Sequence, residues 1–177
     1  KAFAPFVNYY VSSGFSNPYN FFYKLDMLSA FPYPKLMLWI LSVPRFIFSP
    51  LLSHDYQVVS LAHIFLYRLP IIAADVAIFI ILARWLKNKQ EKVLKYYWCS
   101  PVLFYISYIH GELDAIPIML LFVFLYFLFK EKFYTAFVFL ALSLSAKTGM
   151  LVVMPFVLVY LILKKVSVKK IILLMLI

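Results

Sequence analysis

The chain is poor in several residues on which soluble enzymes and secreted domains depend. Its 177 residues include one cysteine, three glycines and seven acidic side chains, and charged residues make up only 14% of the sequence. The lone Cys99 excludes a disulfide within the chain and a cysteine-based metal centre. We interpret it as a helix-packing residue, because a free cysteine usually behaves as a small buried hydrophobe.

The common catalytic and nucleotide-binding motifs are also missing from the sequence. It contains no Walker loop, no dinucleotide-binding glycine pattern, no serine-nucleophile elbow and no heptad run. Internal repeats and low-complexity linkers are absent too. These absences leave a single helical membrane domain as the most economical interpretation.

Apolar side chains, in contrast, are abundant. The chain is 66% hydrophobic and 20% aromatic, and its mean hydropathy is +0.93. This composition lies outside soluble usage and predicts an all-α, polytopic transmembrane protein. The net charge of +10 would favour a nucleic-acid partner in a soluble protein, but here the bases cluster in short loops between apolar runs. We therefore expect membrane lipid, and no nucleic acid, among its partners.

Three basic loops define the expected topology. They contain Arg84, Lys87, Lys89, Lys92 and Lys95; then Lys130 and Lys132; then Lys164, Lys165, Lys169 and Lys170. Placing these loops in the cytosol predicts about five complete spans, over residues 60–86, 96–109, 114–129, 133–145 and 150–163, with a sixth beginning at residue 171. Several are shorter than the ~20 residues of an ideal span. All three glycines and all three histidines then fall toward the non-cytosolic side, where we expect the chemistry.

Two regions follow from this topology, a non-cytosolic loop over residues 1–59 and a transmembrane helical module over residues 60–177. Within the first, residues 17–20 (Asn-Pro-Tyr-Asn) predict a turn. Residues 34–52 are apolar but contain Pro44, Arg45 and Pro50, and we predict a helix lying in the outer membrane interface, with Tyr33 and Trp39 at headgroup level. A kinked transmembrane helix is the alternative.

One polar cluster stands out between two long uncharged runs, at residues 110–114 (His-Gly-Glu-Leu-Asp). Ionisable groups at membrane depth are costly, so their presence predicts a functional site. The uncharged flanks place this cluster where two helices turn at a membrane surface.

The ordered set of polar elements resembles the GT-C superfamily of membrane glycosyltransferases. The elements are Asn-Pro-Tyr at 17–19, Phe-Pro-Tyr-Pro at 31–34, Arg68 seven residues before Asp75, the 110–114 cluster, and Ala-Lys-Thr at 146–148. The sequence is most similar to the branch that uses polyprenyl-phosphate sugars, including the dolichol-pathway glucosyltransferases of the endoplasmic reticulum and their prokaryotic relatives.

The resemblance implies a hexose transfer at the non-cytosolic face of an endoplasmic reticulum or prokaryotic plasma membrane. The donor would be a polyprenyl-phosphate sugar, the acceptor a glycan or a lipid-linked molecule, and the displacement inverting. In this family the general base is an aspartate near the start of the first outer loop. The chain begins at Lys1 without a Met and ends in an apolar run, so we expect a fragment, inactive by itself, with the main base upstream. Asp26, the only carboxylate in the first fifty residues, is the alternative base.

Such a transfer needs positive charge to hold the departing phosphate. Arg68 suits this role because a guanidinium offers parallel donors to phosphate oxygens, and Lys147 and His110 are the further candidates. For Arg68 an ion pair with Asp75 remains an alternative, and for Lys147 snorkelling to the headgroups.

The resemblance implies that Tyr33, Glu112 and Asp114 bind the substrate. Capping of the following helix is the alternative for Asp114. No cofactor is expected, and divalent-metal binding by the 110–114 cluster is only weakly indicated, because three residues within five positions do not close a site. A secondary transporter and a non-catalytic membrane subunit are the rival classes, although a transporter's charges usually meet at mid-membrane.

Overall fold

The computed structural model describes residues 3–27, 31–53 and 55–176, and this part of the chain is helical without strands. The N-terminal elements are α1 (Ala4–Ser12), α2 (Pro18–Lys24), α3 (Lys35–Ile47) and η2 (Ser49–Leu51). The middle comprises α4 (Leu61–Trp85), η3 (Lys87–Lys89), α5 (Gln90–Val93), η4 (Leu94–Trp98), α6 (Pro101–Phe104) and η5 (Tyr105–His110). The last elements are α7 (Ala115–Phe129), α8 (Phe133–Ala146), η6 (Thr148–Val153), α9 (Met154–Leu163) and α10 (Val168–Met175). The all-α prediction is confirmed for these residues.

The N-terminal helices α1–α3 pack around aromatic rings. Phe6 of α1 stacks on Phe22 of α2, with ring centroids 4.1 Å apart, and on Phe31 at 5.5 Å. Residues 17–20, predicted as a turn, instead begin α2: the Asn17 side chain accepts a hydrogen bond from the Tyr19 backbone N–H at 3.0 Å, and residues 18–20 are helical. This capping bond, together with a proline in the first turn, begins the helix at residue 18.

Helix α3 realises the helix expected within residues 34–52, but it has only 13 residues. It is therefore about 20 Å long, shorter than the ~30 Å of a bilayer core, as α8 and α9 also are. The interfacial helix and the kinked crossing helix both stay predictions. Arg45, which interrupts the apolar run, is buried; its Nε donates to the Asn8 side chain at 3.1 Å and its Nη2 to the Ser53 carbonyl at 2.7 Å. The Asn8 side chain also accepts a hydrogen bond from the Tyr67 hydroxyl of α4. This bond connects the N-terminal helices α1–α3 to α4.

Helix α4 matches the predicted span over residues 60–86. It follows Ser60, whose side chain and that of His63 form a reciprocal capping box. Within the described residues it is the one helix both long and apolar enough to cross a membrane. Shorter apolar helices cover Ala115–Phe129, Phe133–Ala146 and Thr148–Leu163, close to the other predicted runs. A multi-pass topology thus stays a prediction.

The continuous span expected over residues 96–109 is wrong. The π-helical η4 ends at Trp98, and a new start follows at Ser100, whose side chain accepts from the Leu103 N–H before Pro101 opens α6. Proline has no N–H to donate and disfavours helical geometry in the residue before it. The helix therefore breaks at residues 99–100, and the chain resumes as α6 and the π-helical η5.

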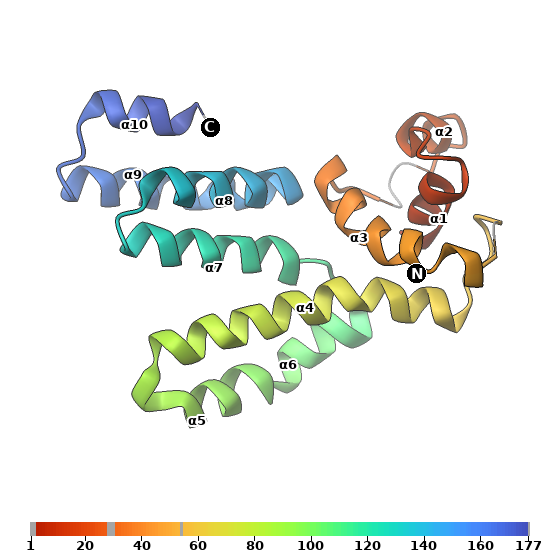
Figure 1. Ribbon diagram of the computed structural model, residues 1–177, viewed down its shortest axis with the longest axis horizontal. Helices are drawn as coiled ribbons and strands as arrows, with labels where there is room; N and C mark the ends of the chain where they lie inside the picture. The colour runs from red at the N-terminus through yellow and green to blue at the C-terminus, as the bar shows by residue number, and fades with distance from the viewer. Residues whose placement is uncertain (1–2, 28–30, 54, 177) are drawn as a thin grey trace.

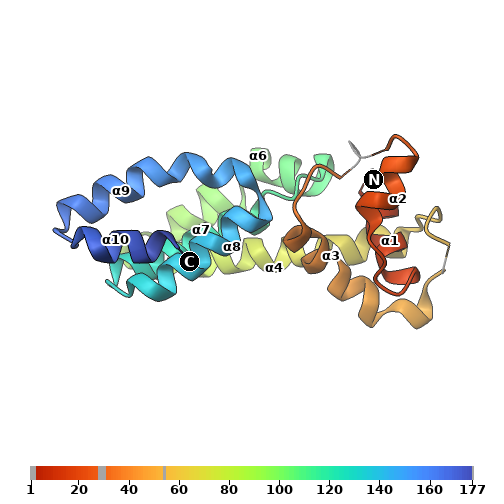
Figure 2. The same ribbon diagram turned by 90° about the horizontal axis from the view of Figure 1, so that it is seen from above.

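Helices α7 and α8 form a hairpin, covered by α9 and α10 (Figure 2). The Ser143 hydroxyl donates to the Pro117 carbonyl at 2.8 Å and closes the hairpin near its open end. The apolar core of this region consists of Phe124, Leu128, Ala136, Phe137, Leu140, Val157, Leu161 and Leu174.

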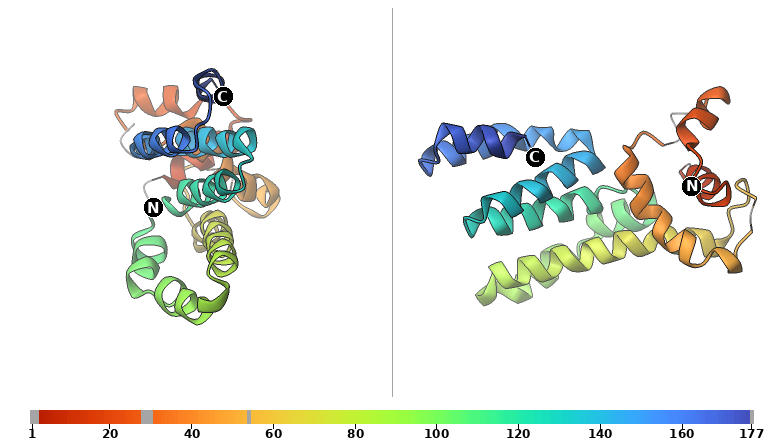
Figure 3. Two further views of the ribbon diagram at one scale, coloured as in Figure 1. Left: turned by 90° about the vertical axis from the view of Figure 1, so that its left-hand side faces the viewer. Right: turned by 45° about the horizontal axis from the view of Figure 1, so that its top comes forward.

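The three basic loops meet at one end of the helical bundle, and the N-terminal unit lies at the other (Figures 1 and 3). The Lys164 ammonium of the α9–α10 turn binds Glu131 of the α7–α8 turn at 2.9 Å. The Trp85 ring, at the end of α4, lies 5.9 Å from that of Phe129. The fold thus separates a basic end from an end that carries residues 110–114.

Candidate functional site

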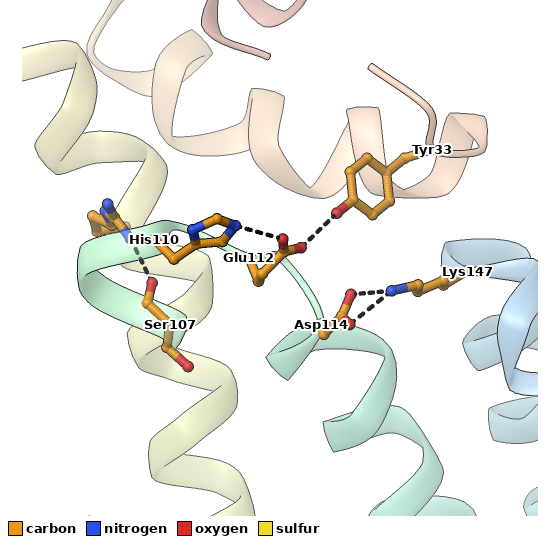
Figure 4. Close-up of polar contacts among 7 residues, drawn as sticks. Tyr33, Ser107, His110, Glu112, Asp114 and Lys147 are labelled. Atoms are coloured by element: carbon orange, nitrogen blue, oxygen red, sulfur yellow. Dashed lines mark hydrogen bonds and ion pairs between the residues drawn. The ribbon is translucent and has the colours of Figure 1, made fainter. Parts of the chain in front are cut away.

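The candidate site lies at the end of the bundle opposite the basic loops. Figure 4 shows side chains from the loop before α3, from η5 and the segment between it and α7, and from the residue after α8. These segments are far apart in sequence, and the packing of α3, α7 and α8 brings them to one place.

Glu112 is the centre of the first contact group. Its carboxylate accepts a hydrogen bond from the Tyr33 hydroxyl at 3.4 Å and lies 3.2 Å from the His110 Nε2. The His110 and Glu112 side chains are 60% and 39% exposed, so their ion pair contributes at most about 1 kcal/mol. A ligand could therefore contact either side chain, because breaking the pair costs little free energy.

Tyr33 acts as a hydrogen-bond donor over the whole physiological pH range. Burial, together with the nearby negative charges of Glu112 and Asp114, raises the pKa of its phenol to about 12. The ring therefore presents a neutral O–H to the Glu112 carboxylate.

Asp114 and Lys147 form the second contact group. The Lys147 ammonium lies 2.5 Å and 2.7 Å from the two carboxylate oxygens, and both side chains are about one-third exposed. Asp114 occupies the position before α7, but its side chain makes no capping hydrogen bond; the capping alternative is wrong in that sense, because Lys147 takes the carboxylate instead. Lys147 has extended backbone geometry (φ −152°, ψ 116°) that ends α8, and its ammonium turns to Asp114.

Arg68 reaches the same end of the bundle from α4. Its Nη1 donates to the Ser107 carbonyl at the end of the broken helix. The expected alternative, an ion pair with Asp75, is not formed, because the Asp75 oxygens accept from the Tyr97 and Tyr108 hydroxyls. Arg68 is thus held by a neutral backbone carbonyl, which leaves its charge without a carboxylate at ion-pair distance among the described residues.

A cavity of about 270 Å³ brings Arg68 and His110 together. Its other lining residues are Phe3, Ala4, Ile64, Tyr67, Ile109 and Gly111. One guanidinium, one imidazole and apolar walls fit an anionic group attached to an apolar body. Lys147, Asp114 and Glu112 do not line this cavity, so the structure does not bring Lys147 together with Arg68 and His110 there.

Gly111 shapes the turn beneath Arg68, and its substitution gives a testable prediction. Its φ is +93°, and a Cβ there would lie 3.4 Å from the Arg68 Nη2. Gly14 has a φ of +68°, but a Cβ there would meet nothing within 4 Å. We expect Gly14→Ala and Gly111→Ala each to cost the left-handed backbone penalty of about 1–2 kcal/mol. Only Gly111→Ala also places a methyl group in van der Waals contact with the guanidinium, and it should therefore weaken phosphate binding in the Arg68 cavity.

The measurement is thermal unfolding of both variants together with their affinity for a short-chain polyprenyl phosphate. Gly14→Ala serves as the control for backbone strain. Equal unfolding midpoints combined with equal affinities would show that Gly111 does not position Arg68.

The remaining sequence predictions fall outside these contacts. Asp26 lies exposed in the turn after α2, with a φ of +56°, and the described contacts of its carboxylate include none of the other site residues. Within the described residues, no group of three or more His, Cys, Asp or Glu side chains is placed to hold a metal ion. The roles of Ser107, Tyr97 and Tyr108 as hydrogen-bond partners of Arg68 and Asp75 were not predicted from the sequence. Their polar groups within an otherwise uncharged run were the signal that could have indicated them.

No protein-family model, curated protein or solved structure matches the chain significantly.

Proposed function

We propose that the chain belongs to a polytopic membrane glycosyltransferase that moves a hexose from a polyprenyl-phosphate donor to a glycan or lipid-linked acceptor. The observation that carries this proposal is the cavity that Arg68 and His110 share at the bundle end opposite the basic loops, with the His110–Glu112 and Lys147–Asp114 pairs at the same end. This end of the bundle offers basic side chains that could bind a phosphate and other polar side chains that could bind a sugar, whereas the helices themselves are apolar.

Exposed apolar side chains support the membrane part of the proposal. On α9, Phe156, Val159, Ile162 and Leu163 are between 56% and 76% exposed. Large contiguous apolar surfaces are rare on soluble monomers and typical of membrane contacts. The gathering of the basic loops at one end is the arrangement that the positive-inside rule requires of α4, α7, α8 and α9 as crossing helices.

Topology is directly testable by cysteine labelling in a Cys99→Ser background. Ser16, Thr148 and Asn88, the three positions for single cysteines, are all exposed. In intact cells or sealed vesicles, an impermeant maleimide should label Ser16→Cys and Thr148→Cys from the non-cytosolic side, and Asn88→Cys only after permeabilisation. Labelling of Asn88→Cys without permeabilisation would contradict the orientation and move the site to the cytosol.

The proposed reaction assigns a role to each cation. An acceptor hydroxyl attacks the anomeric carbon, the bond from that carbon to the phosphate oxygen breaks, and the hydroxyl proton passes to a carboxylate. Arg68 and His110 would bind the phosphate in their cavity, because charge grows on its oxygens as the bond breaks. Glu112 and Asp114 already hold Tyr33, His110 and Lys147, which favours a base elsewhere, either Asp26 or a carboxylate outside this chain.

The test is sugar transfer by the full-length protein in membranes. Polyprenyl-phosphate hexoses with a labelled sugar should yield a labelled acceptor and free polyprenyl phosphate, with inverted anomeric configuration. If no donor of this class supports transfer and none binds, the proposed function is wrong.

A further inference from the structure

A second polar cluster lies on α4, about two helical turns from Arg68. The Asp75 Oδ1 accepts from the Tyr97 hydroxyl at 3.0 Å, and its Oδ2 accepts from the Tyr108 hydroxyl at 2.5 Å. Tyr97 belongs to η4 and Tyr108 to η5, so the two phenols come from opposite sides of the helix break. Both segments are π-helical, a geometry that occurs frequently at functional sites.

This carboxylate lies on the wall of a cavity of about 300 Å³ beside the broken helix. Four aromatic rings line the same cavity, those of Tyr97, Trp98, Phe104 and Tyr108, together with two aliphatic side chains. The volume is at the lower limit for small-molecule sites. The walls thus combine one carboxylate with predominantly aromatic surface.

Asp75 has no cationic partner among the described residues. Each of its carboxylate oxygens accepts one phenol hydrogen bond, whereas the three ion pairs there involve Glu112, Asp114 and Glu131. A carboxylate among apolar walls that is not paired with a basic side chain favours a cation as its ligand.

The walls decide which kind of cation fits. Calcium and magnesium ions require six or more oxygen ligands, whereas this cavity offers the Asp75 carboxylate and two phenol oxygens beside carbon surfaces. Aromatic faces attract substituted ammonium groups, whose charge is spread over apolar substituents. We propose that the Asp75 cavity binds an organic ammonium group that carries apolar substituents.

Such a group could come from a soluble amine or from the choline headgroup of a lipid. The site is independent of the proposed transfer reaction.

The test uses the full chain in nanodiscs of phosphatidylglycerol, with Trp39→Phe and Trp85→Phe, so that Trp98 is the only tryptophan. Benzyltrimethylammonium is the probe, and neopentylbenzene, which has the same shape without the charge, is the control ligand. Trp98 fluorescence reports occupancy.

We expect a saturable response to benzyltrimethylammonium that weakens on the order of tenfold or more in Asp75→Asn, while the response to neopentylbenzene is equal in both proteins. Glu91→Gln removes the same charge from an exposed position on α5 and should leave the affinity unchanged. Tyr108→Phe keeps the ring but releases one carboxylate oxygen, and it should weaken binding severalfold.

Two outcomes would overturn the inference. One is an equal response to the two ligands in the protein that retains Asp75, and the other is an ammonium affinity that Asp75→Asn leaves unchanged. The first comparison needs no variant at position 75, so it decides even if Asp75→Asn does not fold. Adding phosphatidylcholine to the nanodiscs then identifies the source of the ammonium group: competition with the probe would indicate a lipid headgroup, and its absence a soluble amine.

Discussion

Replacing Lys147 by alanine should lower kcat/KM for the polyprenyl-phosphate donor by roughly one to two orders of magnitude in the full-length protein, because leaving the partly exposed Asp114 carboxylate without its partner costs about 1–3 kcal/mol. Lys147 holds both oxygens of Asp114 at 2.5 Å and 2.7 Å. Its loss would leave Asp114 as an uncompensated negative charge at the end of the bundle where the donor is proposed to bind. The measurement is initial-rate kinetics in membranes at matched protein level.

The partner residue provides the control. If Lys147 serves only to neutralise Asp114, the double variant Lys147→Ala with Asp114→Ala should recover most of the activity. If Lys147 acts on the phosphate, the double variant should stay as impaired as Lys147→Ala. Lys164→Ala removes a lysine that pairs with Glu131 at the opposite end of the bundle, and it should leave the kinetics unchanged.

Arg68→Ala should impair donor use more strongly, by roughly two to three orders of magnitude, while the protein level persists. The guanidinium lines the 270 Å³ cavity beside His110 and is oriented by the Ser107 carbonyl. Arg68→Lys should recover only part of the activity, because an ammonium cannot present two parallel donors to a phosphate. Donor kinetics and donor binding should fall together.

The structure also predicts how this substitution responds to a second change. Asp75 is held by two phenols and not by Arg68, so Asp75→Asn should not rescue Arg68→Ala. Rescue would show that the two form a structural pair and would remove Arg68 from the site. Arg84→Ala changes the same residue type near the other end of α4, among the basic loops, and should have no effect on donor kinetics.

The sequence predicted the helices best where one long apolar run is bounded by charges. Helix α4 covers Leu61–Trp85 against the predicted 60–86, and α7 and α8 begin and end within one residue of their predicted limits. Local composition suffices there, because a helix satisfies its own backbone hydrogen bonds and lysines mark its ends. The same reasoning failed over residues 96–109, since average hydropathy does not register the effect of Pro101 on the helix before it.

The sequence by itself determined the helical class, the apolar surface and the separation of basic loops from the 110–114 cluster, because these depend on composition and on the order of residues along the chain. Only the tertiary structure decided which charges meet. Asp114 and Lys147 lie 33 residues apart, and Tyr33 and Glu112 lie 79 apart, so their contacts depend on how the helices pack. Asp75 likewise accepts hydrogen bonds from two tyrosines and does not pair with Arg68 on its own helix. The broken helix brings both phenols within hydrogen-bonding distance of this carboxylate.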